Sequence, residues 1–314
     1  MHALILAGGL SHERDVSIRS GRRVQEALRG AFDQVSLRDV DTELIPTLRF
    51  GGVDVVWPLL HGSSGEDGSL QALLELVGVP YVGTTSRAAR VAWNKAVAKA
   101  VMMRAGIDSP DYVTLPQSLF REVGAEHVLD TVVARFGLPV VIKPARGGSA
   151  LGISIVEDRD DLARAMVHCF AYGDVALIER AVKGVELAIS VVGTGDDARA
   201  LPAVEIAVEG TYDYDARYNP GRVEYFAPAR LTPEQAEIAA QAALTVHRTM
   251  ELRDLSRVDL ILDADNRAQV IDINIAPGMT ETSLFPQAAE AAGLDLGTLY
   301  QELVDGAAAR GPVA

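Results

Sequence analysis

The sequence of 314 residues is poor in several features, and each shortage excludes a class of protein. Its single cysteine, Cys169, excludes an internal disulfide and any cysteine-based metal cluster. A reducing compartment, the cytoplasm, is therefore expected. No uninterrupted apolar run approaches the roughly 20 residues that a membrane-spanning helix needs. The apolar N-terminus has no basic flank and runs into Gly8 and Gly9, which predicts a strand rather than a signal peptide.

Positive charge is also scarce. The chain has 29 Lys and Arg residues against 43 Asp and Glu, a formal net charge of −14, which disfavours nucleic acid or an anionic membrane as a partner. Only four of the basic residues are lysines: Lys95, Lys99, Lys143 and Lys183. Lysine is normally among the commonest residues. The four that remain are therefore candidate positions at which a compact ammonium group is needed.

The rest of the composition, 48% hydrophobic and 23% charged, is typical of a globular chain, and its patterning predicts α/β and α+β units in sequence. Strand and helix patterns alternate up to about residue 85, which predicts a parallel, doubly wound sheet. A helix is predicted over residues 88–105. Strands of a small α+β unit with antiparallel character are predicted over 138–143, 153–156, 175–179 and 186–193. A final unit has a helix over 232–250 and strands over 203–208, 256–262 and 268–274.

A glycine-rich turn follows the predicted strand that ends at Lys143. The run KPARGGSALG supplies one ammonium group and several backbone N–H groups, which are the components of a phosphate-binding loop. It lacks the Gly-Lys-Ser/Thr of a P-loop and lies between two strands. The alternative interpretation is a flexible hairpin loop.

Two neighbouring predicted strands carry a second group of polar residues. Alternation places Arg257 and Asp259 on one face of the first strand, and Asp272 and Asn274 on one face of the second. If these strands pair, the oxygens of Asp259, Asp272 and Asn274 converge, and such hard ligands suit Mg²⁺. Solvated acids on a hairpin are the alternative.

Three further segments carry polar residues in loops. The first, after Gly8 and Gly9, could bind a phosphate or a cationic group, although Glu13 by itself favours a role as a first-turn helix acid. The second, HGSSGEDG at residues 61–68, follows a predicted strand, where α/β folds place ligands. The third, residues 210–228, is a long loop in which Arg217 and Tyr218 offer a cation and a hydroxyl suited to anion binding. A purely structural aromatic loop is the alternative.

In order, these segments closely resemble the D-alanine–D-alanine ligases of the ATP-grasp superfamily. The runs that carry the resemblance span residues 8 to 286: GGLSHERDVS, LLHGSSGEDGSLQALLELVGVPYVG, NKAVAK, VVIKPARGGSALGIS, ALIERAVKGVEL, YDYDARY, RVDLIL and DINIAPGMTETSLFP. Eight motifs in the same order are far more specific than any one of them. The resemblance implies an ATP-grasp fold with a Rossmann-like parallel-sheet domain over 1–87, a central α+β domain over 88–180, and a catalytic domain over 181–314.

The resemblance also implies the reaction, its cofactors and its partners. Two D-alanines and ATP would give D-Ala-D-Ala, ADP and phosphate through a D-alanyl phosphate, in the cytoplasm, for peptidoglycan precursor synthesis. ATP and two Mg²⁺ ions, with Mn²⁺ as a substitute, would be the cofactors, and the enzyme would be a homodimer. The residues implied in nucleotide binding are Lys95 and Lys143 for phosphates, Glu179, Arg180, Ala181 and Val182 for adenine, Glu186 for ribose, and Arg217 for the γ-phosphate.

The remaining implied roles concern the metals and the amino acids. Asp259, Asp272 and Asn274 would bind the metals. Glu13 would receive the ammonium of the first D-alanine, with Ser149 and Tyr218 completing a hydrogen-bonded set. Arg257 and the Gly278 N–H would stabilise the tetrahedral oxyanion, and Ser283 would bind the carboxylate of the second D-alanine.

Some positions depart from the family pattern. Arg217 stands where lysine is usual, Asn94 where aspartate is usual, and Asp272, one methylene shorter, where glutamate is usual. These changes leave open a divergent ATP-grasp ligase that joins D-alanine or other amino acids to a different partner. A nucleotide-binding regulator without turnover is the alternative from another class. Tyr218 favours an amine as nucleophile, because relatives that form the D-Ala-D-lactate ester usually have histidine near this position.

Overall fold

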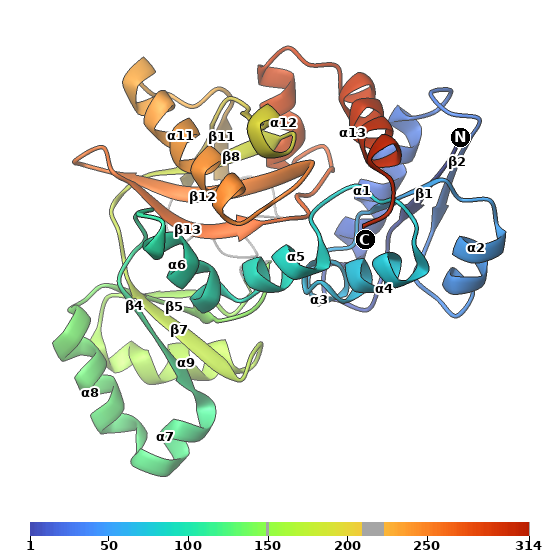
Figure 1. Cartoon of the computed structure of the whole chain (residues 1–314). Helices are drawn as coiled ribbons and strands as arrows, with labels where there is room; N and C mark the ends of the chain where they lie inside the picture. The colour runs from blue at the N-terminus through green and yellow to red at the C-terminus, as the bar shows by residue number, and fades with distance from the viewer. Residues whose placement is uncertain (149–150, 209–222, 314) are drawn as a thin grey trace.

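The computed structural model describes residues 1–148, 151–208 and 223–313. The described chain forms three sheets, one parallel and two antiparallel, with helices packed on each (Figure 1). The mixed α/β and α+β class predicted from the sequence is confirmed. None of the helices in this part of the chain is both long and apolar enough to cross a membrane.

The N-terminal sheet is parallel, with the order β2-β1-β3. Its strands are β1 (His2–Leu6), β2 (Gln34–Arg38) and β3 (Val55–Pro58), and its helices are α1 (Arg14–Ala27), α2 (Leu44–Phe50), α3 (Ser63–Glu66) and α4 (Ser69–Val77). Each strand is connected to the next through a helix, as the alternating pattern predicts. The loops that contain Glu13 and His61 follow the carboxyl ends of β1 and β3, where α/β sheets bind ligands.

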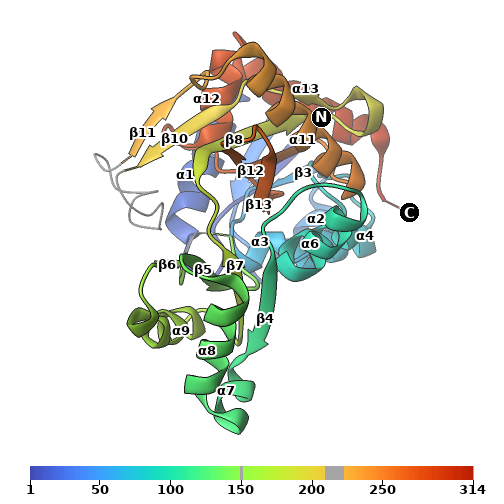
Figure 2. The ribbon, with the colours of Figure 1, turned by 90° about the vertical axis from the view of Figure 1, so that its left-hand side faces the viewer.

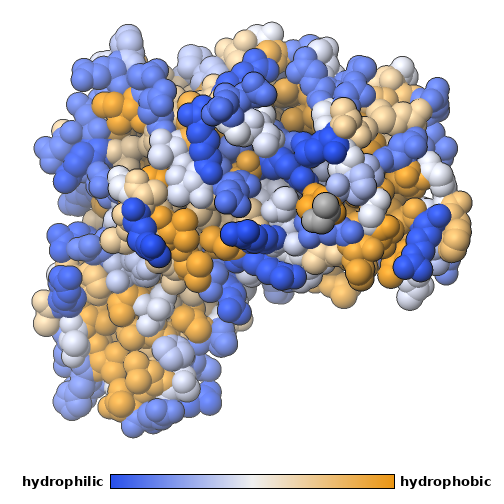
Figure 3. All heavy atoms as spheres, in the orientation of Figure 1, coloured by the Kyte–Doolittle hydropathy of each residue, from blue (hydrophilic) through white to orange (hydrophobic). Residues whose placement is uncertain are grey.

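The smaller antiparallel sheet has the order β4-β7-β5-β6 and forms the lobe at the bottom of Figures 1 and 2. Its elements are β4 (Tyr112–Pro116), α7 (Gln117–Val123), α8 (Ala125–Phe136), β5 (Val140–Pro144), β6 (Ser154–Val156), α9 (Leu162–Phe170) and β7 (Val175–Arg180). Figure 3 shows apolar side chains gathered over this lobe. A cluster of buried apolar residues, among them Leu129, Ile142 and Cys169, packs its helices on the sheet.

The third sheet has the order β11-β10-β8-β12-β13, with β9 paired to β8. Its elements are β8 (Gly184–Val192), β9 (Arg199–Ala200), β10 (Val204–Val208), β11 (Val223–Phe226), α11 (Pro233–Thr249), β12 (Leu255–Asp263) and β13 (Ala268–Asn274). The sequence pattern groups the strand over 186–193 with the middle third, but β8 pairs with β10 and β12 instead. The chain therefore passes from one sheet to the next between Arg180 and Gly184. The boundaries at residues 87 and 180 stay predictions.

The helix predicted over residues 88–105 is two helices, α5 (Ser86–Trp93) and α6 (Lys95–Arg104). The break is at Asn94, which has an extended backbone and whose side-chain oxygen caps α6 by accepting from Val97 N at 3.2 Å. Asn94 also forms a bridge with Arg146 of the glycine-rich loop. Apolar periodicity continues across the break, so it does not reveal the cap. The break places Lys95 at the first position of α6, beside that loop.

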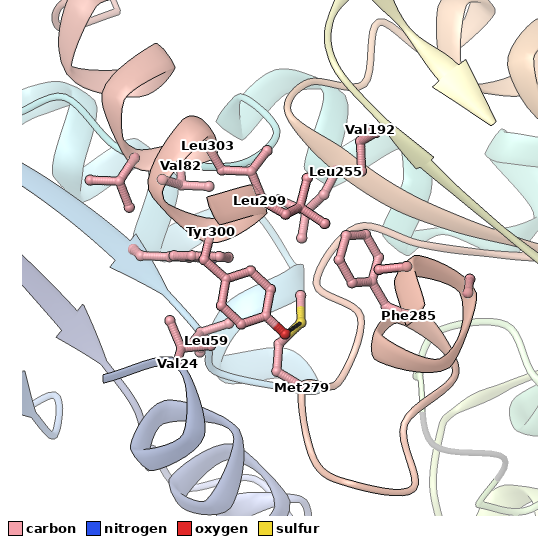
Figure 4. Close-up of a cluster of buried hydrophobic side chains, with 14 of the residues drawn as sticks. Val24, Leu59, Val82, Val192, Leu255, Met279, Phe285, Leu299, Tyr300 and Leu303 are labelled. Atoms are coloured by element: carbon pink, nitrogen blue, oxygen red, sulfur yellow. Dashed lines mark hydrogen bonds between the residues drawn. The ribbon is translucent and has the colours of Figure 1, made fainter. Parts of the chain in front are cut away.

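The C-terminal helix α13 (Leu296–Arg310) returns to the N-terminal sheet, where it contacts β3 and α1, whereas α12 (Leu284–Ala291) packs on β8 and β10 of the third sheet. Tyr300 packs edge-to-face on Trp57 of β3, with ring centroids 5.3 Å apart, and its hydroxyl donates to Met279 Sδ at 3.4 Å (Figure 4). Met279 is fully buried in this cluster. The core thereby fixes the turn that contains Gly278.

A buried histidine makes the stability of the fold depend on pH. The ring of His247 is buried and contacts Ser256 Oγ at 2.7 Å and Gly193 O at 3.2 Å. Burial lowers its pKa to about 4. In the unfolded chain the imidazole of His247 takes up a proton below about pH 6.5, whereas in the folded chain it does so only below about pH 4. Protons therefore favour unfolding in that interval, and stability falls as the pH falls from about 6.5 to 4.

We expect His247→Gln to lose less stability on acidification than the wild type, by up to about 3 kcal/mol for one group shifted by this amount. Urea unfolding at pH 7, 5.5 and 4.5 measures the difference. Parallel losses in both proteins at all three values would contradict the assignment to His247.

Candidate functional site

The central face of the site is formed by β12 and β13. These strands pair antiparallel, with Arg257 opposite Asn274 and Asp259 opposite Asp272. The register shifts between Asp259 and Leu260, directly after the polar pair. Because residues directly opposite one another share a face of the sheet, all four side chains are on one side. The pairing on which the predicted site depends is therefore present.

Two ion pairs hold the carboxylates on this face. Arg257 donates from Nε and Nη2 to the two oxygens of Asp259, both at 2.7 Å. Lys95 Nζ lies 2.5 Å from Asp272 Oδ1. Burial acts to raise the pKa of the Asp272 carboxyl, but Lys95 and Lys143 outweigh it and lower that pKa. The Asp272 carboxylate is thus held ionised next to a cation.

A second ion-pair group lies behind the glycine-rich loop. Lys143 Nζ is 2.5 Å from Glu179 Oε1 and donates to Ile271 O at 3.0 Å. Lys99 Nζ lies 2.8 Å from Glu179 Oε2. Glu179 is 2% exposed, and burial acts to raise its pKa, but the two ammonium groups lower it. Sequence reasoning left Lys99 without a role, although the scarcity of lysine was a signal that pointed to it.

A cavity of about 620 Å³ lies between the N-terminal loops and the smaller antiparallel sheet. Of the predicted site residues, Glu13, Lys95, Lys143 and Asp272 line it. Trp93 and Arg146, which the sequence did not single out, line it too. A cavity of this size with several cations can receive a phosphorylated ligand.

A smaller cavity of about 40 Å³ adjoins the first, with Glu13 in the wall of both. The structure brings five predicted residues together around it: Glu13, Arg257, Asn274, Gly278 and Ser283. The set comes from the N-terminal loop, β12, β13 and the segment before α12. Such a position suits a small polar substrate next to the larger cavity.

Gly278 and Ser283 are in close contact. A Cβ at Gly278 would lie 2.7 Å from Ser283 Oγ, so a larger residue there would displace the hydroxyl. That hydroxyl contacts Thr280 Oγ1 at 2.8 Å and accepts from Thr280 N at 3.0 Å. A side chain at Gly278 would therefore push against Ser283, whose hydroxyl is held by Thr280.

His61 and Glu66 also line the smaller cavity, although sequence reasoning placed them only in a candidate ligand loop. Burial, with the nearby Glu13 carboxylate, raises the pKa of Glu66 to about 8, and Glu66 accepts from Gly62 N at 2.7 Å. Burial lowers the pKa of His61 to about 4, and Arg257 acts in the same direction. At neutral pH Glu66 is therefore mostly a neutral acid and His61 a neutral imidazole. The HGSSGEDG run after β3 was the signal for both residues.

Other predicted residues lie apart from these cavities or outside the described chain. Glu179 to Val182 and Glu186 do not line the cavities above; Arg180 is exposed, and Ala181 N donates to Pro139 O at 3.1 Å. Ser149, Arg217 and Tyr218 lie outside the described residues.

The donor set of the predicted metal site fits a hard divalent cation by type. Asp259 and Asp272 contribute carboxylates from opposite positions on paired strands, and Asn274 contributes an amide oxygen. Among the described residues no group of three or more His, Cys, Asp or Glu side chains is placed to hold a metal. In this structure the positive charges of Lys95 and Arg257 balance the carboxylates of Asp272 and Asp259, the role that a bound metal ion would otherwise have.

Known proteins resemble the chain over nearly its whole length. Models described as D-ala D-ala ligase N-terminus and C-terminus match residues 38–84 and 101–305. A D-alanine–D-alanine ligase from Desulforudis audaxviator (strain MP104C) is 39% identical over 302 residues, 96% of each chain. The VanG D-Ala:D-Ser ligase from Enterococcus faecalis superposes with a TM-score of 0.84 at 25% identity, covering 97% of this chain and 98% of that one. A D-alanine–D-alanine ligase from Bacillus anthracis gives 0.81 at 27% identity, covering 99% and 98%.

Proposed function

The chain belongs to the D-alanine–D-alanine ligase family, and we propose that it joins two D-alanines, with conversion of ATP to ADP and phosphate, for peptidoglycan precursors. One observation supports this most strongly. Five residues expected from the family motifs surround one small cavity that adjoins a larger, cation-lined one. A two-cavity site suits an enzyme that activates an amino acid with a nucleotide and then joins it to a second one.

The larger cavity would receive the phosphates of ATP. Lys95 and Lys143, both in its wall, would contact the phosphates, and Arg217 would reach the γ-phosphate. The segment from Glu179 to Val182 would hold adenine and Glu186 the ribose. Asp259, Asp272 and Asn274 would hold two Mg²⁺ ions, or Mn²⁺ in their place. The metals would supply charge neutralisation and positioning for phosphoryl transfer.

The smaller cavity would hold the reacting amino acids. Glu13 would bind the ammonium of the first D-alanine, a role that Ser149 and Tyr218 share in the family, and Ser283 would bind the carboxylate of the second. The family reaction begins when the carboxylate of the first D-alanine takes the γ-phosphoryl group and ADP leaves. The amine of the second D-alanine then attacks the acyl carbon, phosphate leaves, and the amine loses a proton.

Arg257 and the Gly278 N–H would stabilise the charge that develops on the carbonyl oxygen in that second step. Donors that are already in place when the charge appears need no reorganisation during the reaction. The two-point pair with Asp259 fixes the Arg257 guanidinium, and the buried Met279 fixes the turn of Gly278. Both groups are therefore held rigidly by the fold.

The test is an ADP-release assay with ATP, Mg²⁺ and D-alanine, with the product identified by mass. We expect ADP formation that depends on D-alanine and a product with the mass of D-Ala-D-Ala. L-alanine is the matched control and should release little ADP. Absence of D-alanine-dependent ADP formation would overturn the proposal.

A D-Ala-D-X ligase is the second candidate. The likeness to a D-Ala:D-Ser ligase favours it, together with the hydroxyls of Thr280, Thr282 and Ser283 at the smaller cavity. Competition between D-alanine, D-serine and D-lactate for the second position, read by product mass, separates the two candidates. A homodimer in the cytoplasm completes the proposal, and light scattering of the purified chain tests the dimer.

A further inference from the structure

Three of the four lysines of this sequence lie in the ion-pair groups of the site. Lys95 and Lys143 have proposed contacts with ATP, whereas Lys99 has none. Lys183 is exposed in the connection between the two antiparallel sheets. In a chain that uses arginine at 25 other positions, a buried lysine next to the site calls for a physical explanation.

Lys99 is one turn after Lys95 on α6, which lies between the two antiparallel sheets in Figure 1. Only 2% of it is exposed. Its ammonium group donates to Ser109 Oγ at 2.6 Å and to Pro110 O at 3.3 Å, and lies 5.3 Å from the centre of the Tyr112 ring. Its fourth neighbour is Glu179 Oε2, at 2.8 Å. Burial lowers the pKa of Lys99 to about 8, so the group remains mainly charged at neutral pH.

Glu179 is thus shared by two lysines, one on each carboxylate oxygen. Lys143 takes the other oxygen, at 2.5 Å, and is the lysine with a proposed phosphate contact. To bind an anionic phosphate, Lys143 must weaken its attachment to Glu179. Without Lys99, this movement would leave the buried Glu179 carboxylate with no cation, which costs free energy because the group stays charged in a medium of low polarity.

We propose that Lys99 is a positioning residue for nucleotide binding: it keeps Glu179 neutralised, so that Lys143 can turn to the phosphates. This proposal rests on one part of the proposed function, which is that the larger cavity binds an adenine nucleotide. Lys99 touches no substrate in this scheme and acts through Glu179 and Lys143. Lys99, Glu179 and Lys143 form a row of two ion pairs, and Lys99 is at the end of the row away from the cavity. It can therefore influence Lys143 without touching the ligand.

The experiment is a double-mutant cycle with Lys99→Met and Glu179→Gln, both close in shape to the residues they replace. The readout is the Kd of Mg²⁺–ADP, measured by calorimetry in the absence of D-alanine. In Lys99→Met we expect the Kd to rise about 10- to 100-fold, the range for loss of a hydrogen bond to a charged group. In the Glu179→Gln background, the same Lys99→Met change should alter the Kd by less than about threefold, because no carboxylate then competes for Lys143.

Ser109→Ala is the matched control, because it removes the other close partner of Lys99 without changing charge. It should leave the Kd of Mg²⁺–ADP within about threefold of the wild type. In Lys99→Met, the KM for ATP should rise while the KM for D-alanine changes little. Lys99→Arg, which keeps the charge, should retain most of the affinity even if its thermal stability falls, and it serves as the test if Lys99→Met does not fold.

Three results would overturn the proposal: an equal effect of Lys99→Met in both backgrounds, an equal rise in the KM for ATP and for D-alanine, or loss of affinity in Lys99→Arg as large as in Lys99→Met. Failure of the proposed function is a different outcome. A wild type that binds Mg²⁺–ADP but makes no dipeptide would refute the ligase activity and leave this test intact.

Discussion

Replacement of Arg257 by alanine is expected to lower kcat by roughly two to three orders of magnitude, the usual effect of removing one oxyanion donor. Arg257 is 6% exposed, lines the smaller cavity with Gly278, and is fixed by two hydrogen bonds to Asp259. The lost interaction is one made with charge that develops during the reaction. The KM for ATP should therefore change far less than kcat.

The same substitution has a second, separable consequence for stability. Asp259 is 4% exposed, and removing its two-point partner leaves a buried carboxylate uncompensated, at a cost of about 3–5 kcal/mol. Kinetics are therefore to be measured on protein shown to be folded by circular dichroism at the assay temperature. Excess Mg²⁺ should restore stability more than turnover, because a cation can balance Asp259 but cannot donate the lost hydrogen bond. Turnover near that of the wild type would reject the role of Arg257.

Replacement of Asp272 by alanine is expected to lower kcat by at least about three orders of magnitude, because a metal ligand supplies several kcal/mol of charge stabilisation. Asp272 is opposite Asp259 on the paired strands and 2.5 Å from Lys95. Its removal takes a carboxylate from the metal set and leaves the Lys95 ammonium without this partner. The Mg²⁺ concentration for half-maximal activity should rise as well.

Asp272→Glu is the informative partner variant, because glutamate is usual at this position in the family. If the shorter side chain is a compromise, the longer one should keep kcat within about threefold of the wild type, or raise it. The check is kcat together with a Mg²⁺ titration on both variants. A large loss in Asp272→Glu would show that Lys95, Asp272 and their surroundings have adjusted to aspartate.

The course of the chain was predictable wherever local pattern carries the information. The parallel βα order of the first third and the family itself follow from alternation, turn residues and ordered motifs, whereas the pairing of the strands of Arg257 and Asp272 was only a condition that the structure met. The break at Asn94 was not predicted. Apolar periodicity continues through that residue, and only the cap on Val97 and the bridge to Arg146 show that a helix ends there.

The site divides in the same way. Side chains alternate between the two faces of a strand, so the sequence alone could place Arg257 with Asp259 on one strand, and Asp272 with Asn274 on the other. It could not place the partners of these groups. Lys95 meets Asp272 across 177 positions of the chain, and the position of Lys99 behind Glu179 depends on how α6 packs between two sheets.

By itself, then, the sequence determined the family, the order of the elements and the chemical types at the site, because these are encoded in short segments. Only the tertiary structure decided which lysine neutralises which carboxylate, and that Glu66 is held as a neutral acid and His61 as a neutral base. Burial and charge at a point in space arise from segments far apart in the chain, and no local pattern records them.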